Sequence, residues 1–254
     1  MKKIFATISA TALILALTAC GGAKLSAYEL YLKADEMMAS ATSVSMDIEG
    51  NMSMSIGEES LDIEISGSAQ EIIRSETDID MAMTMTMDMM GMSMETTGYY
   101  KDGYMYTSMS GMNAKMAMGI DEALASANIQ QMEFGEDAVT SAEVTDVTDG
   151  KKLTFDIDPT KLGEILDSLT ESVAGQVGMD GMDMQIGNMH YEMVVDKDNY
   201  MKSAVITMAL SMAIEGQEIS LSYNIAMNNM EYNQITEITF PADLDTYTDI
   251  SDLA

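Results

Sequence analysis

The chain has 254 residues, with 12 basic and 42 acidic side chains and a net charge of −30. Such an acidic balance argues against nucleic-acid binding and against electrostatic attachment to anionic lipids. Apolar residues make up 47% of the chain, thirty residues are methionine and none is tryptophan, so the composition is that of a globular domain and not of a disordered tail.

Residues 1–19 have the pattern of a secretory signal peptide. Lys2 and Lys3 form a positive start, and an uncharged apolar run from Ile4 to Leu17 follows. The run is shorter than the roughly 20 residues that a membrane-spanning helix needs. We expect this segment to be removed, which leaves 235 residues with 10 basic and 42 acidic side chains and a net charge of −32.

The only cysteine, Cys20, directly follows this segment. Leu17-Thr18-Ala19-Cys20 resembles the bacterial lipobox, and the resemblance implies a cysteine that becomes N-terminal and carries palmitate-type acyl chains. We expect residues 20–25 to form the lipidated cysteine and a short tether, which places the protein outside the cytoplasm on the cell membrane. No other thiol is then left for a disulfide, a thiolate metal site or a nucleophile. An ordinary signal peptide with an incidental cysteine is the alternative.

The mature chain is expected to begin with a helix at Ser26. Ser26 and Glu29 have the spacing of a capping box, and apolar residues then recur every three or four positions as far as Ala41. From Ser43 the period changes to two, which predicts strands with one apolar and one polar face. Three turns separate these strands: Gly57-Glu58-Glu59, Met89-Met90-Gly91 and Lys101-Asp102-Gly103.

The middle of the chain is less regular. A short helix over 121–130 and a strand over 139–147 are expected, and Asp149-Gly150 predicts a hairpin. Asp158 followed by Pro159 has the pattern of a helix start, and apolar residues continue from there at helical spacing.

The last third of the chain again predicts strands, which end with a short one over 235–240, and the acidic tail from Asp243 is expected to be loosely ordered. In all, the pattern predicts an α+β, mainly β fold with about eleven strands and two or three helices. So few helices cannot cover a flat sheet of that size. We therefore expect a curved antiparallel sheet, a half-open barrel wrapped around the helices, in a single domain over residues 26–254.

This order of elements is familiar. A lipobox, a capped helix, long antiparallel strands with K-D-G and D-K-D-N turns, a second helix and a final meander resemble the cell-surface lipoproteins of Gram-positive bacteria with a LolA-like or LppX-like fold. The resemblance implies a curved, incompletely closed sheet with an apolar cavity for lipids or lipoproteins. This chain uses methionine where such sheets normally use valine, isoleucine and leucine.

The methionines allow three interpretations. Strand alternation alone places them on one face, so they can be plain core. Their flexible thioethers also suit a cavity for ligands of variable shape. Soft sulfur binds Cu(I), for which Met179, Met182 and Met184 near His190 are the candidates. The candidate cavity-lining residues are Met46, Met52, Met54, Met81, Met83, Met85, Met87, Tyr223 and Met227.

No catalytic motif accompanies the only histidine, His190, which is expected on the polar face beside Glu192. Acid pairs such as Asp196 and Asp198 lack the calcium-loop pattern and predict a turn, and no phosphate-binding loop is present. We therefore expect a membrane-anchored lipoprotein that is not an enzyme, needs no cofactor and binds or carries a lipid or other amphiphile. A structural or protein-interaction module of the cell envelope is the first alternative, and a Cu(I)-binding protein is the second.

Overall fold

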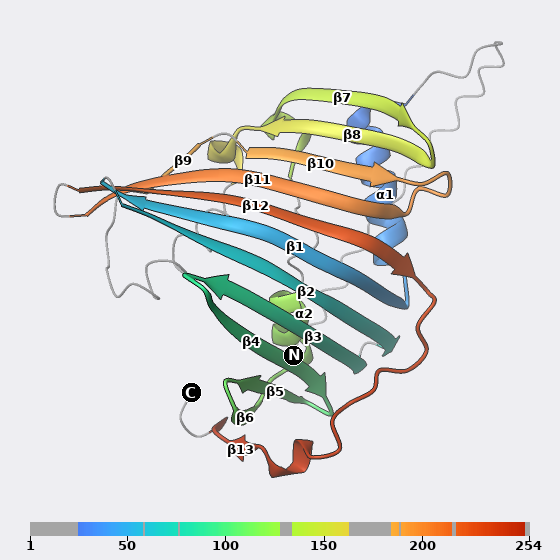
Figure 1. The fold of residues 1–254 in the computed structure, drawn as a ribbon. Coiled ribbons are helices and arrows are strands. Elements are labelled where there is room, and N and C mark those ends of the chain that lie inside the picture. Colours follow the sequence, from blue (N-terminus) through green and yellow to red (C-terminus); the bar gives the residue numbers. More distant parts are fainter. Residues whose placement is uncertain are drawn as a thin grey trace, which may run out of the picture.

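The computed structural model describes residues 25–57, 59–75, 77–127, 134–162, 184–187, 189–214 and 217–251. Strands dominate this part of the chain (Figure 1). The strands are β1 (Ser43–Ile56), β2 (Glu59–Ser75), β3 (Asp78–Met89), β4 (Met92–Lys101), β5 (Tyr104–Met109), β6 (Met112–Ala117), β7 (Val139–Val147), β8 (Gly150–Ile157), β9 (Met184–Ile186), β10 (Met189–Val195), β11 (Met201–Ile214), β12 (Gln217–Tyr232) and β13 (Thr248–Asp249). The helices are α1 (Ala27–Ala39) and α2 (Ile120–Ala127), with 3-10 turns η2 (Glu136–Ala138), η3 (Pro159–Lys161) and η4 (Leu244–Thr246).

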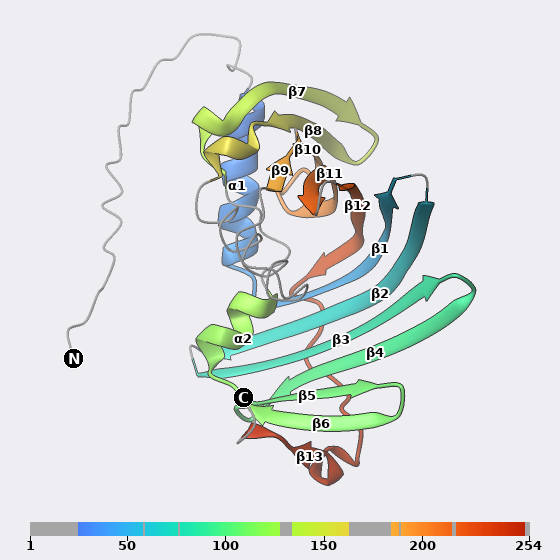
Figure 2. The same cartoon turned by 90° about the vertical axis from the view of Figure 1, so that its left-hand side faces the viewer.

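All thirteen strands belong to one sheet, in the order β13-β6-β5-β4-β3-β2-β1-β12-β11-β10-β8-β7, with β9 paired to β11. Neighbours are antiparallel except for β13, which runs parallel to β6. The sheet is strongly curved, and both α-helices lie on the same side of it (Figure 2). We call this side the inner face and the opposite side the outer face.

The predicted curved antiparallel sheet is confirmed, but the finer description was only roughly right. The sheet stays open, because β7 and β13 lie at its opposite ends and do not pair. The structure therefore agrees with the predicted half-open barrel only in the curvature of the sheet. The described residues contain two α-helices where two or three were predicted, and thirteen strands where about eleven were predicted.

Pairing of β1 with β12 joins the two ends of the chain at the middle of the sheet. The register runs from Val44 opposite Tyr232 to Ile56 opposite Ile219, and β1 also pairs along its whole length with β2. Alternation along these long strands gives the sheet an apolar inner face and a polar outer face. The predicted period of two therefore fixes which side the helices cover, because only the apolar face gains from burial.

Helix α1 begins with the predicted capping box. The Ser26 hydroxyl accepts a hydrogen bond from the Glu29 amide at 3.1 Å, and the Glu29 carboxylate accepts one from the Ser26 amide at 2.7 Å. These bonds satisfy two amide groups that the first helical turn leaves free. The buried face of the helix, which includes Leu30 and Tyr31, packs against the upper strands of the inner face.

Tight turns join the hairpins where the sequence predicted them. Met90 and Gly91 between β3 and β4, and Asp102 and Gly103 between β4 and β5, all have positive φ. This conformation matches the twist of the flanking strands. A third turn of the same kind, Ser110-Gly111, was not predicted, so strand β6 was missed.

The C-terminal segment is the main correction to the predicted fold. The strand expected over 235–240 was wrong, because this segment crosses the outer face, where no strand edge is free to pair with it. Ile238, Leu244 and Tyr247 are buried there, so the tail is well packed and not loosely ordered. It then forms β13 beside β6 and covers the backbone groups of that edge strand.

Several predictions lie outside the described residues. They include the signal peptide over 1–19, Cys20 and most of the tether over 20–25. At the predicted second helix, Asp158 caps the 3-10 turn η3 by accepting a hydrogen bond from the Thr160 amide at 3.0 Å. The rest of that predicted helix lies beyond Leu162, outside the described residues.

Candidate functional site

Two hydrophobic clusters occupy the inner face. The larger one joins α1 to β1, β8, β10, β11 and β12, and its centre is an aromatic group of Tyr31, Phe134, Phe155 and Tyr191. The smaller one lies under α2 and contains Tyr100, whose hydroxyl donates to the Met118 carbonyl at 3.2 Å.

A cavity of 240 Å³ is formed by strands that carry residues of both clusters, and we call it the inner cavity. Most of its lining is apolar. It is lined by Met46, Ile48, Ile65, Ala69, Glu71, Met81, Met83, Met85, Gly98, Tyr100, Met105, Ile206, Ile225 and Met227, together with Gln70, Ala82 and Tyr99, which alternate onto the outer face. Ligand pockets in proteins typically have this form, a mainly apolar lining with a small number of polar groups.

The structure brings together five of the nine candidate cavity residues. Met46, Met81, Met83, Met85 and Met227 line the inner cavity. The other four alternate onto the same face nearer the hairpin turns and are not among the lining residues: Met52, Met54, Met87 and Tyr223. Of these, Met52 and Tyr223 lie directly opposite each other across β1 and β12.

Glycines create part of the cavity. A side chain at Gly98 would meet only the Met83 Cε atom, 4.0 Å away, so the position is open space facing the cavity. Gly67 on β2 is different, because a Cβ atom there would collide with the Thr84 carbonyl and lie 2.8 Å from the Met85 sulfur. Gly67 allows β2 and β3 to approach closely.

Among the described residues that line the inner cavity, Glu71 is the one acidic side chain. Burial raises the pKa of its carboxyl above the ordinary value, and no charged neighbour contributes. Sequence reasoning missed both Glu71 and Gly98. Glu71 could have been found, because it falls in the apolar phase of β2 that includes Ile65 and Ala69; Gly98 carries no such signal.

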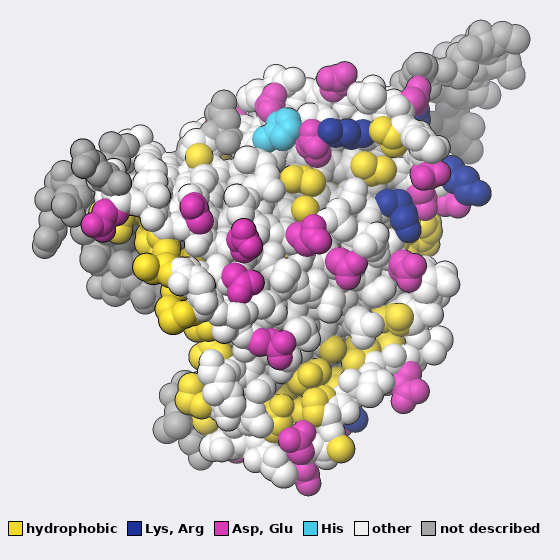
Figure 3. Space-filling view, viewed as in Figure 1, with side chains coloured by type: hydrophobic (Ala, Val, Ile, Leu, Met, Phe, Trp, Pro, Cys, Tyr) yellow, Lys and Arg dark blue, Asp and Glu magenta, His cyan; other side chains and the backbone are white. Residues whose placement is uncertain are grey.

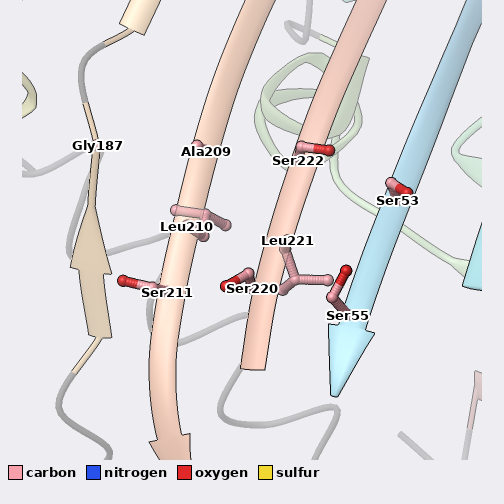
Figure 4. Close-up of a pocket in the computed structure, with 9 residues that line it drawn as sticks. All are labelled: Ser53, Ser55, Gly187, Ala209, Leu210, Ser211, Ser220, Leu221 and Ser222. Atoms are coloured by element: carbon pink, nitrogen blue, oxygen red, sulfur yellow. The ribbon is translucent and has the colours of Figure 1, made fainter. Parts of the chain in front are cut away.

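A second hollow, of 270 Å³, lies on the outer face and has a different chemistry (Figure 4). It is lined by Ser53, Ser55, Gly187, Ala209, Leu210, Ser211, Ser220, Leu221 and Ser222. The serines come from β1, β11 and β12, where Ser220 pairs with both Ser55 and Ser211. Among the described residues that line it, none is titratable, so none of them can act as the general base that a serine nucleophile requires.

His190 lies on the outer face beside Glu192, as predicted. Its Nδ1 atom is 2.8 Å from Asp156 Oδ1, and its Nε2 atom is 3.4 Å from Glu192 Oε1. The hydrogen bond to Asp156 is the main cause that raises the pKa of the imidazole. Lys152 pairs with Glu192 at 2.7 Å, so the histidine belongs to a surface ion-pair group.

The copper candidates fall outside the part of the chain that the structure describes, apart from His190 and the backbone of Met184. Met179 and Met182 lie outside the described residues. Met184 is the first residue of β9, but only its backbone is described. Within the described ranges, no three His, Cys, Asp or Glu side chains come together as a metal site.

Acidic side chains are spread over the outer face, and hydrophobic ones gather over its lower part (Figure 3). In the described part of the chain, no helix has both the length and the hydropathy needed to cross a bilayer.

Solved structures similar to this chain include two mycobacterial lipoproteins. LppX from Mycobacterium tuberculosis is 11% identical with a TM-score of 0.39, and the match covers 84% of this chain and 98% of LppX. LprF from Mycobacterium bovis is 11% identical with a TM-score of 0.33, and the match covers 85% of this chain and 97% of LprF.

A DUF1329 family protein from Desulfovibrio piger is also similar, with 11% identity, a TM-score of 0.28 and coverage of 83% of this chain and 93% of that protein. No curated protein sequence matches the chain. The model of a family of unknown function, DUF6612, matches residues 26–246, which is most of the sequence. The protein therefore belongs to the DUF6612 family.

Proposed function

We propose that the protein is a membrane-anchored lipoprotein outside the cytoplasm, that it is not an enzyme, and that it holds a lipid or other amphiphile in the inner cavity. The observation that carries this proposal is the cavity itself, 240 Å³ of space lined mainly by apolar side chains on the inner face. A concave apolar site with few polar groups is the usual form of a small-molecule binding site.

The size of the cavity favours a ligand with one apolar chain. Its volume of 240 Å³ lies below the roughly 300–1,000 Å³ that is typical of drug-sized ligands. Each methylene group moved from water into the cavity contributes about 0.8 kcal/mol. The methionine thioethers at Met46, Met83 and Met85 can adapt to chains of different length, because each has several rotatable bonds.

Attachment to the membrane is proposed from the sequence. The lipobox-like segment ends at Cys20, and acyl chains on that residue would hold the domain at the membrane surface. A Cys20→Ala variant is expected to appear in the soluble or secreted fraction, whereas the unchanged protein stays with membranes. Equal membrane association of both would contradict the anchor and leave the cavity proposal untouched.

Native mass spectrometry tests the cavity proposal directly. The exported chain from Gly21 onward retains every described element but lacks Cys20 and therefore cannot carry the acyl chains of the proposed anchor. Any lipid that it retains must be bound noncovalently by the folded domain. After purification without detergent, we expect a mass increment that is released as an amphiphile on denaturation. A bare polypeptide mass, unchanged after incubation with lipid extracts, would contradict the proposal and favour a protein-interaction role. A copper-sized increment would favour the metal alternative.

A further inference from the structure

Glu71 interrupts an apolar row on the inner face of β2. The residues that share its phase on this strand are Leu61, Ile63, Ile65, Gly67 and Ala69. Glu71 lines the inner cavity, and its cross-strand neighbours are Val44 on β1 and Met81 on β3, both buried. A carboxyl group thus lies where every surrounding position of the sheet is apolar.

The described residues that face Glu71 from the neighbouring strands offer it no partner. On β1 these are Val44 and Met46, on β3 Met81, and on β4, beyond Met81, Tyr100, whose hydroxyl already donates to the Met118 carbonyl. Within the described ranges, no hydrogen bond or ion pair joins Glu71 to another side chain.

The nearest basic residue along β2, Arg74, does not pair with Glu71 because it pairs with other carboxylates. Arg74 forms ion pairs with Asp78 at 3.1 Å and with Asp80 at 2.6 Å. Arg74 and Asp80 line the hollow under the C-terminal segment on the outer face, away from the inner cavity. Glu71 is half-buried, so its carboxyl loses part of its contact with water and gains no protein partner in exchange, which costs free energy. A ligand that donates a hydrogen bond to Glu71 would remove that cost.

We propose that Glu71 is the polar recognition group of the inner cavity, and that the ligand is an amphiphile with one apolar chain and a hydrogen-bond-donating headgroup, a hydroxyl or an ammonium. This inference rests on the proposed function. An anionic headgroup, such as a phosphate or a carboxylate, is disfavoured, because it would meet the Glu71 carboxyl in surroundings of low dielectric constant. The net charge of −30 also disfavours an anionic ligand, because it repels negative charge.

Three probes with the same apolar chain test the inference: dodecylamine, dodecanol and dodecanoate. Their affinities are measured by displacement of the fluorescent apolar dye N-phenylnaphthylamine from the exported chain that begins at Gly21. We expect the unchanged protein to bind the amine and the alcohol more tightly than the acid. Glu71→Gln should weaken dodecylamine binding on the order of tenfold, since a charge-assisted hydrogen bond is lost. It should strengthen dodecanoate binding.

Glu64→Gln is the matched control, because this substitution removes the same charge from the outer face of the same strand. It should change none of the three affinities by more than about twofold, since exposed charges are screened. Thermal unfolding of both variants shows that they are folded. Glu71→Leu provides a second variant, which should bind dodecylamine as weakly as Glu71→Gln does.

The outcomes separate the two proposals. If no dodecyl probe and no dye binds the unchanged protein, the amphiphile cavity itself is wrong. If all three probes bind and neither Glu71 variant alters their order, the cavity stands and the role of Glu71 is overturned. A response to the amine alone identifies an ammonium headgroup, and a response to both amine and alcohol identifies a general hydrogen-bond donor.

Discussion

Gly98 on β4 lies directly opposite Met83 on β3, and the absent side chain at Gly98 leaves open part of the inner cavity. A Cβ atom at Gly98 would be 4.0 Å from Met83 Cε, an ordinary van der Waals distance, and would meet nothing closer. The two residues therefore face each other with space between them that another side chain can fill.

Filling this space should stabilise the protein and block the cavity. Gly98→Ile adds a residue with high strand preference and buries apolar area, which together should raise the free energy of unfolding by about 1 kcal/mol. The same change should abolish the mass increment seen by native mass spectrometry and the displacement of bound dye. Denaturant unfolding and dye titration measure the two effects on one sample.

Gly67→Ala is the comparison for Gly98→Ile. Its added methyl group would collide with the Thr84 carbonyl, so we expect a loss of roughly 1–3 kcal/mol in stability. If Gly98→Ile kept full ligand binding while folded, the ligand would occupy another site.

The pH dependence of stability should reveal the Glu71 carboxyl. Because burial raises the pKa of Glu71 in the folded state, the folded protein binds the proton more tightly than the unfolded chain does. The unfavourable contribution is absent below the ordinary value of 4.5, grows as the pH rises from there, and is complete above the folded-state pKa. Glu71→Gln should therefore be more stable than the unchanged protein at neutral pH.

Denaturant unfolding at a series of pH values measures this difference. The stability gap between Glu71→Gln and the unchanged protein should close as the pH falls toward 4.5. Glu64→Gln, on the outer face, serves again as the control. A gap that stays constant across the whole range would show that the Glu71 carboxyl is not desolvated.

Local patterns predicted the strands well, because a period of two and a tight turn each have a direct physical cause. The turn at Asp102-Gly103 needs positive φ at both positions, and these residue types tolerate it. The strand over 139–147 and the outer position of His190 follow from alternation in the same way.

The predictions that failed depended on distant contacts. Thr239 to Asp243 carries no local signal that it will cross the outer face, because its position is set by contacts such as Phe240 with Tyr99, whose ring centroids are 6.1 Å apart. The inner cavity likewise needs the register between β1, β2, β3 and β4, which places Glu71 beside Met81. Alternation predicted the face on which the methionines of β1 and β3 lie, but not their positions along that face.

Removing Phe134 should detach α1 from the sheet. Its ring centroid lies 4.5 Å from that of Tyr31 on the helix and 5.4 Å from that of Phe155 on β8, so it joins the two elements. Phe134→Ala should cost about 3–5 kcal/mol, as expected for deleting a buried aromatic side chain. Phe240→Ala, at a half-buried position on the outer face, is the matched control and should cost less. Equal losses, measured by denaturant unfolding, would contradict the joining role.

His190 should stabilise the protein only when it is protonated. Hydrogen bonding to Asp156 raises its pKa in the folded state, so the stabilising contribution is fully present below the unfolded value of 6.5 and is lost as the pH rises through the folded-state pKa. His190→Gln should therefore be less stable than the unchanged protein at mildly acidic pH and equally stable at alkaline pH. Chemical denaturation at both pH values measures this, and a gap that widened with pH would contradict it.

Methionine oxidation should follow exposure and not position in the sequence. Met90 and Met112 at the hairpin turns are 81% and 67% exposed, whereas Met201 and Met230 are almost fully buried. The buried sulfurs also accept hydrogen bonds from tyrosine hydroxyls, Met201 from Tyr191 at 3.6 Å and Met230 from Tyr232 at 3.7 Å.

Dilute peroxide followed by peptide mass spectrometry should therefore find sulfoxide first at Met90 and Met112 and last at Met201 and Met230. Oxidation at the turns should leave thermal stability nearly unchanged, because those side chains contribute little packing. Sulfoxide at Met83 or Met85 would instead place a polar group in the inner cavity and should weaken dye binding. If a bound amphiphile fills the cavity, it should slow oxidation at these two residues and leave the rate at Met90 unaltered; equal rates with and without ligand would contradict occupancy of the cavity.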